Sequence, residues 1–217
     1  MSTNNTIAQQ NDPDELLEVF DAAGRPTGVA KSRAAIHIEG DWHQAFHCWI
    51  VRPGRQVVLQ RRALTKDTFP GCWDAAAAGH WRFGESPAEA AREIAEELGL
   101  TVDFAELVFR GHERMARHFP SGLVDREHHQ VYVLSSNARL SSYRPDPAEV
   151  SGVGAFQAGE LLALLGGKIS CLTTVEAVRV ADDGAVSPAV FEVQRQDVVP
   201  YSVARVRRIL GSAKFIC

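Results

Sequence analysis

The stretch of sequence that decides the fold runs from Gly79 to Leu100 and reads GHWRFGESPAEAAREIAEELGL. Ser86 is a good N-cap, the proline after it suits the first helical position, and the glutamate three residues after it completes a capping box. Gly99 suits the position just after a helix, where a left-handed backbone ends it. Together these signals predict one helix over residues 87–98.

The predicted helix has an apolar side and an acidic side. At about 100° per residue, alanine, isoleucine and leucine gather on one side. The glutamates gather on the other: Glu89, Glu93, Glu96 and Glu97. A solvated acidic face, partly balanced by Arg92, is the simpler interpretation. Because the face is pure glutamate and follows a glycine-bounded turn, we favour a site for Mg²⁺ or Mn²⁺, which prefer hard oxygen ligands.

The same stretch resembles the Nudix box, G-x5-E-x7-R-E-U-x-E-E-x-G-U, in which U is an aliphatic residue. Nine fixed positions agree by type: Gly79, Glu85, Arg92, Glu93, Ile94, Glu96, Glu97, Gly99 and Leu100. There is one departure, since six residues rather than seven separate Glu85 from Arg92. The glutamates on the helix keep their mutual spacing, so the departure concerns the placement of Glu85.

The resemblance implies a set of residues and a chemistry for them. It implies that Glu93, Glu96 and Glu97 bind the divalent metal, and that one of them positions or deprotonates the attacking water. Arg92 would orient a glutamate through an ion pair, although alone it is also explained as a surface salt bridge. The carbonyl of Gly79 would reach the metal. The catalytic set is therefore predicted to be Arg92 and the three glutamates.

The resemblance to the Nudix family covers residues 16–165. Within the family, the chain resembles the branch that contains isopentenyl-diphosphate isomerases together with Nudix hydrolases. This resemblance is carried by VFDAAGRPTGVAKSRAAIHIEGDWHQAFHCWIV and LQRRALTKDTFPGCWDAAAAGHW. The isomerase assigns a second metal site to three histidines and two carboxylates, which match His37, His43, His80, Asp125 and Glu127. Glu127 enters our predicted metal set. Each histidine, taken singly, is better explained as a polar loop or core residue.

Ala78 separates the two activities of this branch. The isomerase uses a cysteine for proton transfer to a carbon centre, and Ala78 is the residue that matches it. A methyl group cannot exchange a proton. The chain also keeps the pair Glu96 and Glu97, which isomerase members tend to weaken. Both facts favour hydrolysis over isomerisation.

Cations follow a predicted strand upstream of the box. Arg61, Arg62 and Lys66 are candidates for contact with a diphosphate, because forked guanidinium groups match phosphate oxygens. A solvated loop explains them equally well. Glu149 precedes an apolar run and is either an extra ligand or base or a residue that caps a turn.

Bulk properties restrict the class of protein. The chain has 217 residues and a formal net charge of −4. It has no basic run for a nucleic-acid polymer, no signal peptide and no apolar run of membrane length. Its four cysteines are far apart, which favours reduced thiols and a cytoplasmic location.

Strands and helices alternate without a regular βαβ rhythm, which favours an α/β/α sandwich with a mixed sheet. Strands are expected at residues 16–20, 45–51, 56–61, 105–111 and 130–134, and further helices at residues 158–165 and 202–210. Trp49 and Tyr132 are expected in the core. We divide the chain into a flexible tail (1–14), a Nudix domain (15–167) and a C-terminal appendage (168–217) packed on the same domain. The appendage would shape the pocket or form a homodimer contact.

The hypothesis from sequence is a metal-dependent hydrolase that cleaves a diphosphate linkage in a nucleoside diphosphate-X or a related small molecule. One alternative is an isomerase of the isoprenoid diphosphate type, which Ala78 disfavours. Another is a non-catalytic binding module with the same fold, for which the shortened box is the single hint. The identity of the substrate does not follow from the box.

Overall fold

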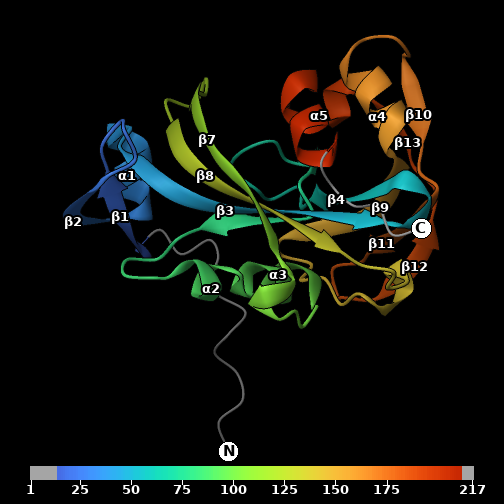
Figure 1. The fold of residues 1–217 in the computed structure, drawn as a ribbon, viewed down its shortest axis with the longest axis horizontal. Coiled ribbons are helices and arrows are strands. Elements are labelled where there is room, and N and C mark those ends of the chain that lie inside the picture. The colour runs from blue at the N-terminus through green and yellow to red at the C-terminus, as the bar shows by residue number, and fades with distance from the viewer. Residues whose placement is uncertain (1–13, 212–217) are drawn as a thin grey trace, which may run out of the picture.

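The computed structural model describes residues 14–211, in which helices and strands are interleaved along the chain (Figure 1). Residues 1–13 of the predicted tail (1–14) and residues 212–217 of the predicted appendage lie outside this part. The strands are β1 (Leu16–Phe20), β2 (Pro26–Ser32), β3 (Trp42–Arg52), β4 (Gln56–Arg62), β5 (Trp73–Asp74), β6 (Ala77–His80), β7 (Val108–His118), β8 (Val124–Ser135), β9 (Val150–Gln157), β10 (Cys171–Thr173), β11 (Glu176–Val180), β12 (Val186–Ala189) and β13 (Glu192–Gln194). The helices are α1 (Arg33–Glu39), α2 (Pro87–Ala90), α3 (Arg92–Leu98), α4 (Ala158–Leu165) and α5 (Val203–Gly211).

The long strand β3 organises the large sheet and creates the gap in which the site lies. On one side it pairs in parallel with β8 from Trp42 to Val51, and β8 pairs in turn with β7. On its other side β3 changes partner: residues 45–48 pair with β6, and residues 50–52 pair with β4. β4 leaves β3 after Val58 and continues beside β9 and β5, so the sheet forks where β6 takes its place beside β3. The sheet is otherwise mostly antiparallel.

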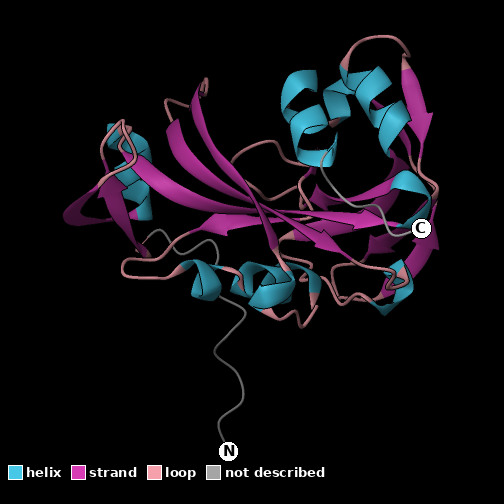
Figure 2. Ribbon diagram, in the orientation of Figure 1, coloured by secondary structure: helices cyan, strands magenta, loops and turns pink. Residues whose placement is uncertain are grey.

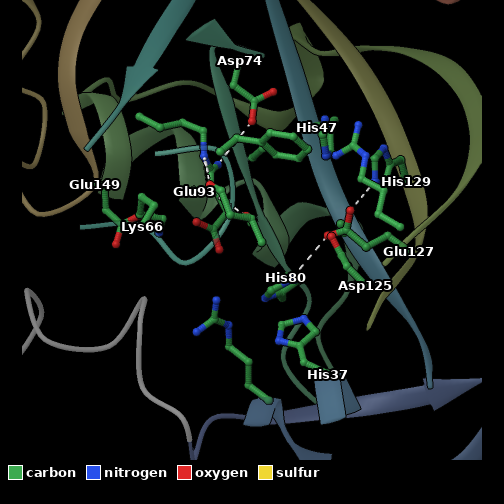
Figure 3. A pocket seen from close by; sticks show the side chains of 18 of the residues that line it. His37, His47, Lys66, Asp74, His80, Glu93, Asp125, Glu127, His129 and Glu149 are labelled. Carbon is green, nitrogen blue, oxygen red and sulfur yellow. Dashed lines mark hydrogen bonds and ion pairs between the residues drawn. The ribbon is translucent and has the colours of Figure 1, made fainter. Parts of the chain in front are cut away.

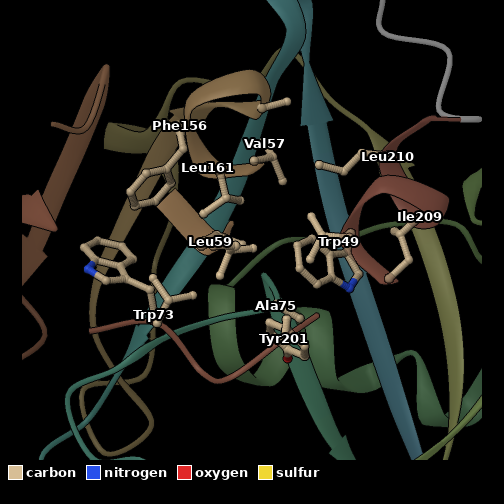
Figure 4. Close-up of a cluster of buried hydrophobic side chains, with 14 of the residues drawn as sticks. Trp49, Val57, Leu59, Trp73, Ala75, Phe156, Leu161, Tyr201, Ile209 and Leu210 are labelled. Atoms are coloured by element: carbon tan, nitrogen blue, oxygen red, sulfur yellow. The ribbon is translucent and has the colours of Figure 1, made fainter. Parts of the chain in front are cut away.

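Helices cover both faces of this sheet, which confirms the predicted α/β/α sandwich. Figure 2 shows α2 and α3 below the sheet and α4 and α5 above it. The side chains of β3 alternate between the two layers, as the pleat of a strand requires. Trp49 packs with Tyr201 and Ile209 near α5 (Figure 4), whereas Phe46 and Ile50 pack with Ile94 of α3. The core positions predicted for Trp49 and Tyr132 are correct, since both are buried.

The single helix predicted over residues 87–98 is divided in the structure. α2 ends at Ala90 and α3 begins at Arg92, with Ala91 between them. The amide of Ile94 bonds to the carbonyl of Ala91, which is one residue closer than in a continuous α-helix. The capping box at Ser86 and the left-handed backbone at Gly99 are both present, as predicted.

Other element boundaries differ from the sequence prediction. Asp125 and Glu127 lie inside β8 rather than before it, because the β7–β8 hairpin is longer than its apolar part. The strand expected at residues 105–111 begins at Val108. The helix predicted at residues 158–165 is correct, and the one predicted at residues 202–210 is found one residue later at each end. Among residues 14–211, no helix is both long and apolar enough to cross a membrane.

Candidate active site

Two buried glutamates of α3 face the backbone of β6 at the fork of the sheet. Glu97 accepts hydrogen bonds of 2.9 Å from the amide of Ala78 and from the side-chain amide of Gln60 on β4. Glu93 lies against Gly79, where a Cβ atom would come well within 3.0 Å of its carboxylate carbon and both its oxygens. Glycine is therefore required at this position to admit the carboxylate. Both glutamates line a cavity together with Ala78 and Gly79.

Arg92 connects the turn before α2 to the glutamates of α3. Its guanidinium donates to Glu85 at 2.7 Å, to Glu93 at 2.6 Å and to Glu96 at 2.7 Å. Glu85 therefore still meets Arg92 although the box is one residue short. Glu89, which the helical projection placed with the acidic face, is exposed and instead caps Ser86. Its capping role removes it from the site.

Burial makes the negative charge on these glutamates costly. It raises the pKa of Glu93 to about 8, against the opposing influence of Arg92. Burial, together with the nearby Glu93 and Glu149, raises the pKa of Glu97 well above its usual range. A cation bound between the carboxylates would remove this cost. Lys66 forms an ion pair with Glu149 on the same wall of the cavity (Figure 3).

A second group of ligand-type side chains faces α3 across the cavity. His37 on α1, His43 on β3 and His80 on β6 have ring nitrogens within 4.8 Å of one another. His43, Asp125 and Glu127 satisfy the same criterion. Figure 3 shows His37, His80, Asp125 and Glu127 on the opposite side of the pocket from Lys66 and Glu149. The structure therefore brings together all five residues matched to the second metal site of the isomerase.

The protonation of this group suits metal coordination. Burial lowers the pKa of His37 and of His80 to about 4 and that of His43 to about 3, so that their rings are neutral ligands at pH 7. Burial alone would raise the pKa of Glu127, but its contacts with His129 and His80 outweigh burial and lower that pKa well below its usual range.

The histidine and carboxylate group fits a divalent cation, because some of its ligand atoms are buried and make no hydrogen bond. His43 Nε2 and Asp125 Oδ1 are buried and make no hydrogen bond. They lie 3.8 Å apart, and Glu127 Oε1 lies 3.4 Å from His80 Nε2 and 4.0 Å from His43 Nε2. Unsatisfied buried polar atoms cost roughly 1–3 kcal/mol each, and a bound cation would satisfy several at once. The oxygen-rich set on α3 suits Mg²⁺ or Mn²⁺, and the imidazole-containing set suits a transition metal.

Cationic side chains form a further part of the cavity wall. Arg33, Arg62, Lys66 and Arg117 all line it. Arg62 is held by Thr68 and by Asp74, at 3.3 Å from a carboxylate oxygen of Asp74. Carboxylates and cations thus share one cavity, as a metal-bridged anionic substrate requires.

The sequence model of the NUDIX domain family matches residues 41–170, more than half of the chain. The chain belongs to the Nudix family. It is 37% identical over 159 residues to an uncharacterised Nudix hydrolase of Clostridium acetobutylicum, covering 72% of this chain and 76% of that protein. It is also 36% identical over 148 residues to an isopentenyl-diphosphate Delta-isomerase of Streptomyces coelicolor, covering 67% of this chain and 73% of that enzyme.

One solved structure is similar to this chain in its fold. DR0079 from Deinococcus radiodurans has a TM-score of 0.53 and 24% sequence identity, covering 70% of this chain and 90% of that one. At this identity the similarity concerns the fold alone. The segment after residue 170, which includes α5, lies outside the part that the family model matches.

One residue of the predicted substrate-binding set, Arg61, does not line the Nudix cavity. Arg62 lines the cavity, whereas Arg61 lies in a separate hollow with Arg179 and Phe191. Its guanidinium donates to the carbonyl of Gly71 and lies 5.7 Å from the ring centre of Phe191. We therefore leave Arg61 out of the proposed site.

Sequence reasoning missed other residues of the Nudix cavity. Arg33 lies four residues before His37 on α1, a helix that was not predicted, and this spacing was the available signal. Arg117 and Tyr201 reach the cavity only through long-range packing, for which the sequence contains no local signal.

Proposed function

We propose that the protein is a divalent-metal-dependent hydrolase that cleaves the diphosphate linkage of a small molecule. One observation carries this proposal: the buried carboxylates Glu93 and Glu97 share a cavity with Arg62 and Lys66. A diphosphate that spans this cavity is attracted by the cations and repelled by the carboxylates. Metal on the carboxylates converts that repulsion into attraction.

Separate residues would bind the metal ions and orient the carboxylates. Bound Mg²⁺ or Mn²⁺ supplies neutralising charge and lowers the pKa of a coordinated water. Glu93 and Glu97, with the carbonyl of Gly79, would hold it on one wall, and Glu96, which Arg92 holds beside this wall, would complete the set. Glu127 with the histidines would hold a second cation on the other wall. Arg92 orients Glu93 and Glu96 of α3 through two ion pairs and connects them to Glu85 through a third.

Proton transfer and charge stabilisation use separate parts of the cavity. Glu97 would accept a proton from water, because its carboxylate is buried on the cavity wall. Ala78 and Gln60 hold one of its oxygens, which fixes the carboxylate for this transfer. Arg62 and Lys66 would bind the diphosphate oxygens and stabilise the negative charge that spreads over them in the transition state.

Isomerisation of an isoprenoid diphosphate is the second candidate, because the histidine and carboxylate group is complete. Against it, Ala78 places a methyl group on the cavity wall where the isomerase has a proton-transferring cysteine. Hydrolysis needs no group at that position. We therefore favour the hydrolase.

The test is turnover of the purified protein on nucleoside triphosphates, nucleoside diphosphate-sugars, dinucleotides, thiamine diphosphate and isopentenyl diphosphate. Each is assayed for phosphate release and for isomerised product, with Mg²⁺, with Mn²⁺ and with chelator. For a substrate that is hydrolysed, Glu97→Gln should lower kcat by about 100-fold or more. Glu89→Gln is the matched control, since Glu89 is exposed and only caps a helix. Unchanged turnover in Glu97→Gln would refute the proposed role of α3.

A further inference from the structure

The segment that follows the matched Nudix region places Tyr201 on the cavity wall and Arg205 against His129, another residue of that wall. Val199 donates its amide to the carbonyl of Trp73, which fixes the segment beside β5. Tyr201 then lines the cavity and donates its hydroxyl to Asp74, the residue that also accepts from Arg62. One turn later on α5, Arg205 is 6% exposed although it carries a full charge. A guanidinium buried to this degree requires specific partners.

Arg205 has partners from three parts of the structure. It forms an ion pair with Glu113 on β7, and its guanidinium carbon lies 4.7 Å from the ring centre of Tyr201. Its third partner is Nδ1 of His129 on β8, at 2.7 Å. The core contacts of Ile209 hold α5 in place, so the guanidinium is presented by a packed helix.

The contact with Arg205 determines which nitrogen of His129 carries the proton. A guanidinium has only N–H donors, so Nδ1 of His129 must accept from it. The single ring proton then resides on Nε2, which lies 2.5 Å from Oε2 of Glu127 and donates to it. The other oxygen of Glu127 is left facing His80 and His43. The hydrogen bonds therefore run from Arg205 through His129 to a proposed metal ligand.

We propose that Arg205 is a positioning residue, which fixes the tautomer of His129 and so aims Glu127 at the histidine cluster. This inference rests on the proposed function, since it assigns a helix outside the matched region to the support of the same cavity. Partners that orient a metal ligand in this way typically contribute about 10- to 100-fold to metal affinity. In this arrangement α5 is part of the active site rather than an accessory layer.

The first test needs no substitution in α5. Long-range ¹H–¹⁵N correlation spectra of the metal-free protein report which imidazole nitrogen is protonated, and the signal that is lost in His129→Gln assigns the residue. We expect the proton of His129 on Nε2 near neutral pH. A proton on Nδ1 would overturn the proposal, whatever the protein hydrolyses.

The second test compares two arginines of the same helix. Co²⁺ is titrated into the metal-free protein and followed by its visible absorption, which responds to imidazole ligands. Arg205→Met should weaken Co²⁺ binding by about 10- to 100-fold, and Arg205→Lys should recover part of the loss. Arg208→Met is the control, because Arg208 pairs with the same Glu113 yet is largely exposed. Thermal unfolding of each variant identifies loss of the fold.

The outcomes separate this proposal from the proposed function. Wild-type Co²⁺ affinity in a folded Arg205→Met variant would overturn the positioning role while leaving the hydrolase intact. Absence of diphosphate hydrolysis, combined with weakened binding in Arg205→Met alone, would overturn the proposed function and support the positioning role. Equal weakening in Arg205→Met and Arg208→Met would assign the effect to Glu113 and refute the path through His129.

Discussion

Substitution of Gly79 by alanine is expected to disable the site through one added methyl group. The new Cβ would lie well within 3.0 Å of the Glu93 carboxylate, whereas ordinary contact begins at 3.4 Å. The neighbouring backbone of β6 is held in the sheet by its pairing with β3, so Glu93 has to retreat. A displacement of roughly 1 Å at a reacting centre costs about 100-fold in rate. We therefore expect kcat/KM for Gly79→Ala to fall by about that factor.

The assay is metal-dependent phosphate release, with Mg²⁺ affinity measured by calorimetry on the same samples. Overpacking of this kind also destabilises a fold by about 1–3 kcal/mol, so the free energy of unfolding is measured alongside. Gly159→Ala serves as the matched control, because a Cβ there meets no atom within 4 Å. A folded Gly79→Ala variant with wild-type Mg²⁺ affinity and turnover would show that the contact between Gly79 and Glu93 does not define the metal site.

Three further predictions follow from the same geometry. Arg62→Ala should raise KM for the diphosphate substrate about 10-fold or more while Arg61→Ala leaves it within twofold, and equal effects would contradict the placement of the two side chains in separate hollows. Arg92→Lys should lower kcat about 10-fold, because one ammonium cannot replace three guanidinium contacts; wild-type kcat would show that these ion pairs do not orient the site. In chelator, the free energy of unfolding, measured by denaturant titration, should fall between pH 6.5 and 8 by up to about 1.4 kcal/mol per pH unit because of Glu93. A flat profile would contradict the raised pKa of Glu93.

The sign of the pH effect follows from the proton that Glu93 binds. Its pKa rises from 4.5 to about 8 on folding, so the folded state holds this proton more tightly. Its contribution to stability is complete below pH 4.5 and is lost as the pH rises to 8. The lowered pKa values of His37 and His80 act in the opposite direction, but only below pH 6.5. Added Mg²⁺ should flatten the profile above pH 6.5, since it favours the ionised carboxylate.

Structural features that depend on contacts between residues close in the sequence could be predicted from the sequence. The capping box at Ser86, the end of α3 at Gly99 and the helix at Ala158–Leu165 depend on contacts between residues a few positions apart. The glutamates of the box belong to the same class, because 3.6 residues per turn determine which of them share a face. The resemblance then added a chemistry that periodicity alone did not specify.

Features fixed by strand pairing were not predictable in the same way. His43 meets Glu127 because β3 and β8 pair in parallel across more than 80 residues of sequence, and no local pattern encodes that register. Arg61 and Arg62 enter separate hollows that are lined by residues distant in the sequence. The contact of Arg205 with His129 requires knowledge of where α5 docks. Resemblance supplied part of this information, and it did so only within the region that it covers.

The shortened box shows which part of the motif carries the geometric requirement. Removal of one residue from a continuous helix would turn Glu85 by about 100° relative to Arg92 and shift it by about 1.5 Å. In the structure Glu85 lies in the turn before α2, the helix is broken at Ala91, and Arg92 donates to Glu85 at 2.7 Å. α3 keeps Glu93 against Gly79 and Glu97 against Ala78 because those contacts lie beyond the break. The requirement is therefore the docking of α3 on β6, and the spacing between Glu85 and Arg92 can vary while their ion pair is retained.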